Sequence, residues 1–406
     1  MIENLSKASP KRLAIKVKPA AERMIRKEHP WIFEEAIVKQ NADGNPGDLA
    51  IIYDQKKNKF MALGLYDPHS VIRVKLLQFK TPAQIDQQWF KTKIEGAYAT
   101  RNLLLQTDTN SYRLLHGEND GLPGLIADVY AQVLVVKLYT AIWPPYLHKI
   151  LPILQQTSTC TCIVLRLSRS LQKTPELLPG LHDGQVIFGK LEQETVIFKE
   201  HGLLFSANVI HGHKTGYFLD HRHNRHKVGT LAKGQRVLDV FAYAGGFSVH
   251  ALAGGAKEVI SLDISAQALE MAKRNVQLNF AEANHKIMAI DAFEGLQKLH
   301  QQDQQFDLIV VDPPSFAKRE SEVEKALHSY HRLAQLAVRL VAPGGTLVLA
   351  SCSSRVTADA FFTATEQALQ ASGRSFQETE RTFHDVDHPI GFPEGAYLKC
   401  GYYKFA

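Results

Sequence analysis

The sequence predicts an α/β protein in which a mostly parallel sheet is preceded by a small β domain and a central α+β domain. One observation is that strand-like and helical stretches alternate from about residue 200 onward, at the spacing of βαβ units. The other is a set of short apolar runs, divided by polar turns, before residue 80. The composition, 45% hydrophobic and 22% charged over 406 residues, is that of a globular protein of several domains and excludes a mainly disordered or fibrous chain.

The N-terminal segment, 12–80, is predicted to form the small β domain. A short helix, Glu22–Lys27, is expected to end before Pro30, because the residue preceding a proline is biased away from helical backbone. The clearest strands are Leu49–Tyr53, Phe60–Leu65 and Val71–Leu76.

The central segment, 84–195, reads as α+β. A helical stretch, Ala83–Leu105, opens it, and a second helix is expected after Pro144 and Pro145. The predicted strands are Leu125–Asp128, Val133–Tyr139, Cys162–Leu167 and Gln185–Lys190. No pattern in this segment indicates a particular chemistry.

The C-terminal segment, 200–406, carries the alternating pattern. Its predicted helices include Ala266–Asn279 and Glu322–Leu340. Its predicted strands are Gln235–Phe241, Glu258–Asp263, His285–Ile290, Asp307–Asp312 and Thr346–Ser351. In such a sheet, ligands bind beyond the carboxyl ends of the strands, at the point where the strand order reverses.

Positive charge is concentrated near the N-terminus. Residues 1–80 contain 15 basic and 9 acidic residues, whereas the other 326 residues contain 32 of each. This excess indicates a separate module with an anionic partner, for which nucleic acid is the obvious candidate. A basic face that is merely solvated is the alternative.

Several classes of protein are excluded by what the sequence lacks. Four cysteines without a CxxC pair make no disulfide framework. No apolar run approaches a membrane span, and residues 1–18 contain no signal-peptide core, so we expect a cytosolic protein with no membrane partner. The histidines in 211–226 have no cysteine partners and lie among basic residues, so no metal is expected.

Four acidic residues each close a predicted strand of the C-terminal segment. They are Asp239, Asp263, Asp291 and Asp312. Each alone could be a helix N-cap, but four in strand order indicate a nucleoside cofactor laid across the carboxyl edge of the sheet.

Individual roles follow from the chemistry of these side chains. Gly245 and Gly246 let the backbone approach a ligand at a helix N-terminus, although their spacing differs from the GxGxxG of nicotinamide enzymes and disfavours a dehydrogenase. Asp263 can accept hydrogen bonds from both ribose hydroxyls. Asp291 can hold an adenine amino group while Phe293 covers the ring.

The segment after the fourth strand faces the substrate in this interpretation. Asp312 is followed by Pro313 and Pro314, which stiffen the chain as it leaves the strand, and then by Phe316. An ionised carboxylate only accepts hydrogen bonds, and the N4 amino group of cytosine donates them. Asp312 and its neighbours are therefore predicted to hold a planar base, with an ordinary strand-to-helix turn as the alternative.

On the basis of these residues, segment 200–406 resembles the class I S-adenosylmethionine-dependent methyltransferases. Within that class the chain resembles the bacterial 23S ribosomal RNA 5-methylcytosine methyltransferases of the large-subunit methyltransferase I type, over nearly its whole length. The motifs that carry this resemblance are Lys214–Arg222, Asp239–Phe247, Asp312–Phe316, Ser351–Ser353 and Asp387–Lys399. His29–Phe33, Gly47-Asp48 and Gly64–Tyr66 resemble the family's N-terminal PUA domain.

The resemblance implies a role for each matching position. S-adenosylmethionine would be the cofactor, and 23S ribosomal RNA, free or in a partly assembled subunit, would be the partner. Asp312 would orient the target base and Cys352 would be the nucleophile. The residues that would hold the cofactor are Asp220, Arg222, Asp239, Tyr243, Ala244, Gly245, Gly246, Asp263, Asp291 and Phe293. A homodimer is compatible with the sequence.

The proposed chemistry explains why a thiol is needed. Cytosine C5 is a poor nucleophile until a thiolate adds at C6, and a free cysteine has a pKa of about 8.5, so a cation such as Arg355 is expected to favour the thiolate. Ser315 stands where a second cysteine would assist release in other methyltransferases. Two alternatives stay open: a ribosomal RNA N-methyltransferase, such as a guanine-N7 enzyme, which needs no thiol, and a non-catalytic RNA-binding assembly factor.

Overall fold

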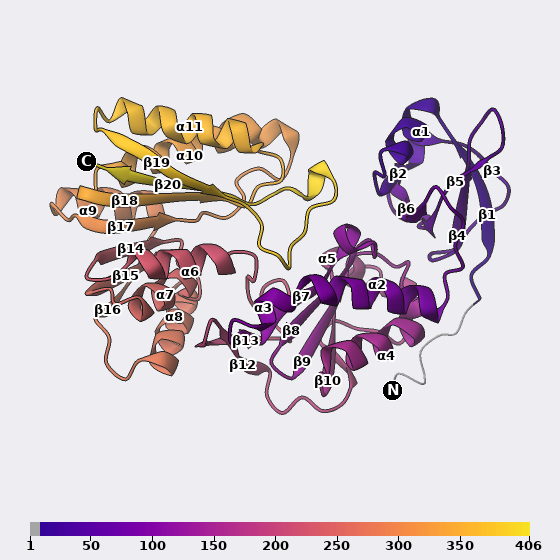
Figure 1. Cartoon of the computed structure of the whole chain (residues 1–406), viewed down its shortest axis with the longest axis horizontal. Coiled ribbons are helices and arrows are strands. Elements are labelled where there is room, and N and C mark those ends of the chain that lie inside the picture. Colours follow the sequence, from indigo (N-terminus) through magenta and orange to yellow (C-terminus); the bar gives the residue numbers. More distant parts are fainter. Residues whose placement is uncertain (1–8) are drawn as a thin grey trace. The chain divides into compact units, whose positions relative to one another are not determined.

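The computed structural model describes residues 9–406, and the chain divides into two compact units (Figure 1). The first unit runs to Phe198 and also takes Ala207–Leu219 and Val386–Phe392. The second unit comprises Lys199–Ser206, Asp220–Asp385 and Pro393–Ala406. The predicted α/β fold class, with a small β domain, an α+β region and a mostly parallel sheet, is confirmed.

The small β domain is a six-stranded sheet in the order β2-β6-β5-β4-β1-β3. Alternate residues of its first strand, such as Leu13 and Ile15, are buried, which is the period-two pattern of a strand with one face on the core. The helix predicted at Glu22–Lys27 is longer and begins at a proline that suits the first helical turn. The elements are β1 (Arg12–Val17), α1 (Pro19–Arg26), β2 (Trp31–Phe33), β3 (Ile37–Gln40), β4 (Leu49–Tyr53), β5 (Phe60–Tyr66) and β6 (Ile72–Phe79).

The rest of the first unit is built on a five-stranded sheet in the order β11-β10-β9-β8-β7. Its helices bury apolar side chains such as Phe90 and Leu154 in a common core. The helical stretch predicted from Ala83 begins later, at Gln87, because Asp86 caps the helix by accepting from the Trp89 amide. The elements are α2 (Gln87–Thr100), α3 (Asn102–Leu105), β7 (Ser111–His116), β8 (Leu125–Tyr130), β9 (Val133–Leu138), α4 (Leu147–Ser158), β10 (Cys162–Leu167), α5 (Arg169–Gln172) and β11 (Gln185–Phe188).

The second unit contains a seven-stranded sheet in the order β16-β15-β14-β17-β18-β20-β19, preceded in the chain by the hairpin β12 (Thr195–Glu200) and β13 (Leu203–Asn208). All its pairs are parallel except those made by β20, which runs antiparallel to both neighbours. The strands are β14 (Arg236–Val240), β15 (Glu258–Asp263), β16 (His285–Ala289), β17 (Phe306–Val311), β18 (Val341–Ser351), β19 (Phe376–Thr382) and β20 (Lys399–Phe405).

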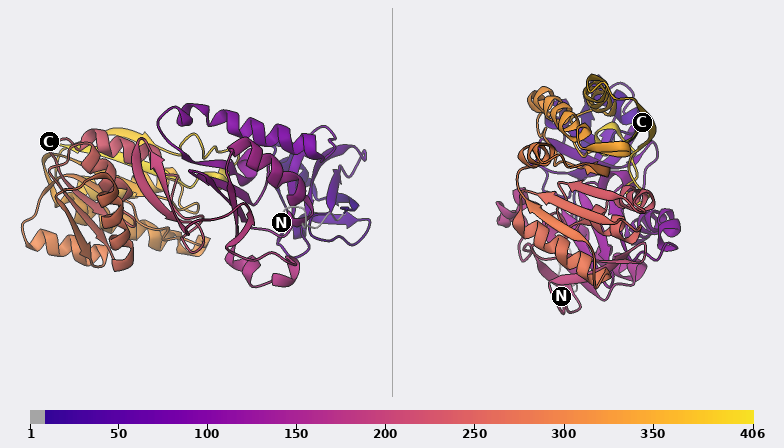
Figure 2. Two further views of the ribbon diagram at one scale, coloured as in Figure 1. Left: turned by 90° about the horizontal axis from the view of Figure 1, so that it is seen from below. Right: turned by 90° about the vertical axis from the view of Figure 1, so that its left-hand side faces the viewer.

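Helices cover both faces of this sheet, as Figures 1 and 2 show. One layer, α9 to α11, packs on the core that contains Leu238 and Phe361, and the other, led by α6 and α7, packs on the core that contains Val237 and Val228. The helices are α6 (Arg222–Leu231), α7 (Gly246–Ala253), α8 (Ala266–Asn279), α9 (Ala292–Gln301), α10 (Val323–Val338) and α11 (Ala358–Ala371).

One predicted boundary in this sheet is wrong. The strand predicted as Thr346–Ser351 starts earlier in the chain, because β18 begins at Val341 and includes Gly344 and Gly345. Val341 pairs with Phe306, and pairing with β17 resumes only between Thr346 and Leu308, so the intervening glycine segment, with Gly344 at a φ of 67°, is a bulge in the strand.

The strand order reverses between β14 and β17, with β15 and β16 on one side and β18 on the other. The Asp312 amide donates to the Val240 carbonyl oxygen at 3.2 Å, so the ends of β14 and β17 stay joined at this point. Ligands of open α/β sheets bind at such a reversal, beyond the carboxyl ends of the strands.

Candidate active site

The loop after β14 has an unusual backbone. Phe241 and Tyr243 have φ values of 66° and 47°, a left-handed region that non-glycine residues enter at a cost, and such strain gathers at functional sites. Gly245 also has a positive φ, 74°, and a Cβ there would lie 2.7 Å from the Cβ of Ala272. Gly245 is therefore required both by the turn and by the packing of α8 against it.

Asp239 lies under this loop and is almost fully buried, with 1% of its surface exposed. Its Oδ2 accepts from the Ser248 amide at 3.1 Å and the Ser248 hydroxyl at 2.7 Å, while its Oδ1 is buried without a hydrogen-bond partner in the described chain. Burial, helped by the nearby charges of Asp312 and Asp263, raises the pKa of Asp239 to about 7. An orphaned acceptor at a sheet edge fits a ligand that brings a donor.

Two of the other acids are already used by the backbone. Asp263 accepts from the Tyr243 amide at 3.0 Å through Oδ2 and from the Ser265 amide at 2.8 Å through Oδ1, so it fastens the Tyr243–Gly246 loop to the end of β15. Asp291 caps α9 by accepting from the Phe293 amide at 2.9 Å. The helix-cap alternative is thus realised at Asp291, although a carboxylate keeps acceptor sites beyond those that a cap uses.

An arginine covers one side of Phe293. The Arg332 guanidinium lies 5.0 Å from the centre of the Phe293 ring, within the range of a cation–π contact. The expected adenine contact would therefore use the part of this ring that Arg332 does not cover.

Asp312 follows β17 and faces a buried histidine. The His221 Nε2 lies 3.2 Å from Asp312 Oδ1, close enough for an ion pair but without hydrogen-bond alignment. Burial disfavours the charged imidazole, but the charge of Asp312 outweighs that effect and the pKa of His221 is raised above its ordinary value. The sequence interpretation gave His221 no role, although it lies between Asp220 and Arg222 in a motif already singled out.

Cys352 follows β18, and its sulfur lies beside the loop that follows β17. The Sγ is 3.9 Å from the Pro313 carbonyl oxygen, and the residue is half-buried. Phe316 of the same loop packs on Tyr330 with ring centres 5.1 Å apart, while Pro314 is exposed. The other three cysteines of the chain are buried, and the pKa values of their thiols are raised by burial, so they are ordinary core residues.

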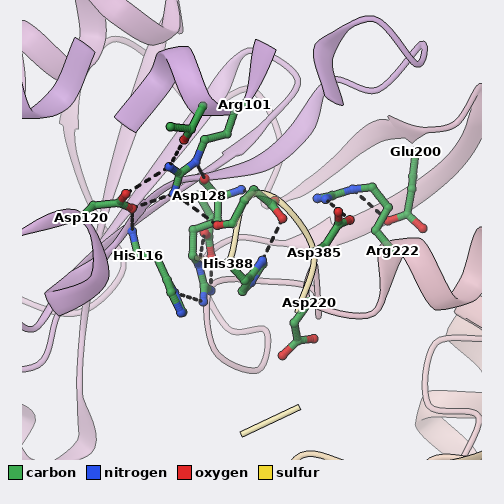
Figure 3. Close-up of polar contacts among 12 residues, drawn as sticks. Arg101, His116, Asp120, Asp128, Glu200, Asp220, Arg222, Asp385 and His388 are labelled. Atoms are coloured by element: carbon green, nitrogen blue, oxygen red, sulfur yellow. Dashed lines mark hydrogen bonds and ion pairs between the residues drawn. The ribbon is translucent and has the colours of Figure 1, made fainter. Parts of the chain in front are cut away.

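Asp220 and Arg222 lie at the start of α6 in a buried polar cluster (Figure 3). The Arg222 guanidinium donates to Asp385 at 3.0 Å and approaches Glu200 at 3.9 Å. Asp220 accepts from the Tyr397 hydroxyl at 3.0 Å. Asp220 and Arg222 already contact other side chains of the same chain, so their contacts with a cofactor stay predictions.

The first unit contains a buried network that the sequence interpretation missed (Figure 3). Arg101 pairs with Asp120 through bonds of 3.1 and 2.6 Å, and Arg113 pairs with Asp128 through bonds of 2.8 and 2.9 Å. The Arg113 amide also donates to Asp387 at 2.9 Å, which ties segment 386–392 to the five-stranded sheet. Such pairs join residues far apart in the sequence, and no local pattern reveals them.

Other functions would require a metal centre or a membrane-spanning helix. Between residues 9 and 406, no group of three or more His, Cys, Asp or Glu side chains is arranged to hold a metal ion. Over the same range, no helix combines the length and apolarity that crossing a membrane requires.

Comparison with known proteins places the chain among methyltransferases. A family model described as S-adenosylmethionine-dependent methyltransferase matches residues 112–396, and a PUA-like domain model matches residues 15–79. A relative named ribosomal RNA large subunit methyltransferase, from Deinococcus radiodurans, is 45% identical over 97% of both chains. A relative named ribosomal RNA large subunit methyltransferase I, from Tolumonas auensis, is 37% identical over 93% of this chain and 96% of its own.

A solved structure shares the fold. SMU.776, a proposed methyltransferase solved with SAH, superposes with a TM-score of 0.82 over 97% of this chain and all of its own length, at 19% sequence identity. At that identity the likeness shows the fold alone.

Proposed function

This chain belongs to the ribosomal RNA large subunit methyltransferase I family, a group of S-adenosylmethionine-dependent enzymes, and from that premise we propose that it methylates C5 of a cytosine in 23S ribosomal RNA. The observation that carries the choice of C5 is the half-buried sulfur of Cys352, 3.9 Å from the Pro313 carbonyl oxygen. A methyltransferase that acts on a ring nitrogen needs no thiol beside its base-binding loop.

The residues at the sheet edge fit the cofactor. The unpartnered Oδ1 of Asp239 and the carboxylates of Asp263 and Asp291 supply acceptors for the hydroxyl and amino groups of a nucleoside. When bound, S-adenosylmethionine supplies an electrophilic methyl group. In this proposal Asp263 binds the ribose, and Asp291 and Phe293 bind the adenine. The methionine end is bound by the Tyr243–Gly246 loop together with Asp220 and Arg222.

Cys352 and Asp312 divide the work on the base. Asp312 accepts a hydrogen bond from the N4 amino group and holds the ring. The Cys352 thiolate forms a bond to C6, which shifts the electron pair of the C5–C6 double bond onto C5. C5 would use those electrons to bond the methyl carbon while the bond between that carbon and the sulfonium sulfur breaks. Loss of the C5 proton to a base then re-forms the ring double bond and expels the thiolate, so the products are 5-methylcytosine, S-adenosylhomocysteine and a proton.

The N-terminal PUA-like domain is proposed to bind the RNA. Ten of its basic side chains are exposed, a surface that suits phosphate contacts. The exposed basic residues are Arg12, Lys18, Arg23, Arg26, Lys27, Lys39, Lys56, Lys57, Lys59 and Lys80. We place the working domain borders at 12–80, 84–195 and 200–406.

The experiment is nucleoside mass spectrometry and site mapping of ribosomal RNA from a deletion strain. Re-expression of the wild-type protein should restore one 5-methylcytosine, Cys352→Ala should not, and the matched control Cys160→Ala, which alters a buried thiol of the first unit, should. Loss and return of 7-methylguanosine instead would identify an N-methyltransferase. An unchanged nucleoside profile would favour the non-catalytic assembly factor.

A further inference from the structure

A buried lysine holds the turn that carries Cys352. Lys399 opens β20 and pairs with Ser351 across the antiparallel register of β18 and β20, and only 2% of its surface is exposed. Its ammonium group donates to the carbonyl oxygens of Ser353 at 2.5 Å, Val356 at 2.6 Å and Tyr397 at 3.1 Å. An ammonium group has three donors, so these carbonyls satisfy it completely and fix its position next to the residue that follows Cys352.

None of these partners carries a charge. Within the described chain, no carboxylate lies at ion-pair distance from Lys399, which is unusual for a buried cation. Burial lowers the pKa of Lys399 to about 8, and the Cys352 side chain acts in the opposite direction by favouring the ammonium. That favourable interaction is reciprocal, because an anion that stabilises a nearby cation is stabilised by it to the same extent.

From this geometry we propose that Lys399 is a positioning residue that holds the Cys352 turn and supplies the buried positive charge that stabilises the Cys352 thiolate. The inference rests on the proposed function, since it assigns the activating group of the proposed nucleophile. The step is a simple ionisation in which the half-exposed thiol gives its proton to water and keeps the S–H electron pair.

Three other ionisable groups of neighbouring segments do not provide that charge. Asp312, one residue before Pro313, is acidic and disfavours a second anion. Burial raises the pKa of Tyr330 to about 12, so its phenol is neutral near pH 7. Arg355, the cation expected from the sequence, is exposed to solvent, where its charge is screened.

The test is the rate at which iodoacetamide alkylates Cys352 in the full-length protein as a function of pH, measured by peptide mass spectrometry without RNA. The three buried cysteines serve as unreactive internal references. Wild-type Cys352 should titrate below the ~8.5 of a free cysteine, and Lys399→Met should slow alkylation near neutral pH by roughly tenfold, one unit of thiol pKa. The control Arg355→Gln should leave the profile unchanged.

Two results would overturn the proposal. One is a folded Lys399→Met protein whose alkylation profile matches the wild type. The other needs no variant and applies even if Lys399→Met does not fold: a wild-type thiol that titrates at or above the free-cysteine value. Both readouts are separate from methylation, so 5-methylcytosine made by Cys352→Ala would remove Cys352 as the proposed nucleophile without deciding how Lys399 affects the thiol.

Discussion

Replacing His221 with glutamine removes the positive charge that faces Asp312 at 3.2 Å and keeps a polar side chain. The pKa of His221 is raised in the folded protein, because the pull of Asp312 outweighs the burial that alone would lower it. Folded His221 therefore stays protonated at pH values where the unfolded chain has begun to release its proton.

The size of the effect follows from burial. Removing one member of a fully buried ion pair costs about 3–5 kcal/mol. The Asp312 side chain is 22% exposed and that of His221 is 6% exposed, so we expect the lower end of that range, about 3 kcal/mol, at pH below the unfolded pKa. A raised pKa means that this stabilisation is fully present below the unfolded pKa and is lost as pH rises through the folded pKa.

Thermal unfolding between about pH 5.5 and about pH 9 measures this difference. For a unit of this size, ~3 kcal/mol corresponds to a lowering of Tm by about 6–12 °C at the acidic end, shrinking toward the alkaline end. His223→Gln is the matched control, since His223 lies exposed on the same helix and should leave Tm unchanged. A wild-type advantage that is constant, or that grows with pH, would refute the assignment of an ion pair between His221 and Asp312.

Three further predictions rest on other features of the second unit and of the PUA-like domain. The stability advantage of Asp239→Asn over the wild type should grow as pH rises from about 4 to about 7 and level off above that, because unfolded Asp239 releases its proton at lower pH than folded Asp239; its affinity for S-adenosylhomocysteine should fall in calorimetry. Gly245→Ala should lose roughly 2–4 kcal/mol of stability by chemical denaturation, whereas Gly234→Ala, at φ 73° with open space around it, should lose only the conformational part of about 1 kcal/mol. Exchanging the three exposed lysines of segment 56–59 for glutamine should weaken RNA binding and flatten its dependence on salt by up to about 0.9 per lost phosphate contact, with kcat unchanged.

The fold was predictable wherever a local pattern determines it. Each predicted strand of the parallel sheet is present, because apolar runs such as Leu308–Val311 are buried on both faces and can be recognised without knowing their neighbours. β20 went unpredicted because its run of Cys, Gly, Tyr and Lys has no period of its own. Its burial comes from pairing with β18 and β19, which only the assembled sheet supplies.

The strand-end acids illustrate a different limit. Their positions were predictable, since a residue that closes a parallel strand reaches the same sheet edge as its counterparts. Their hydrogen bonds were not predictable, because they depend on backbone amides that the fold brings close. Asp239 accepts from the Ser248 amide, and Asp291 accepts from the Phe293 amide of the helix that it caps. The helix-cap interpretation therefore applies at Asp291, and the ligand interpretation of these acids stays a prediction.

The two side chains proposed to act on the base lie at the ends of neighbouring strands, Asp312 after β17 and Cys352 after β18. A buried basic residue from another element faces Asp312, and another holds the carbonyl of Ser353, next to Cys352. His221 comes from the start of α6 and Lys399 from the start of β20, so neither belongs to the strand-then-acid pattern. A pattern in sequence can identify groups that contact a ligand, because each of those must reach the same edge. It cannot identify the groups that set their charge, because burial next to a partner arises only in three dimensions. If His221→Gln leaves Asp312 unaffected and Lys399→Met leaves Cys352 unaffected, the reactivity of this edge must come from the cofactor and the RNA rather than from charges built into the fold.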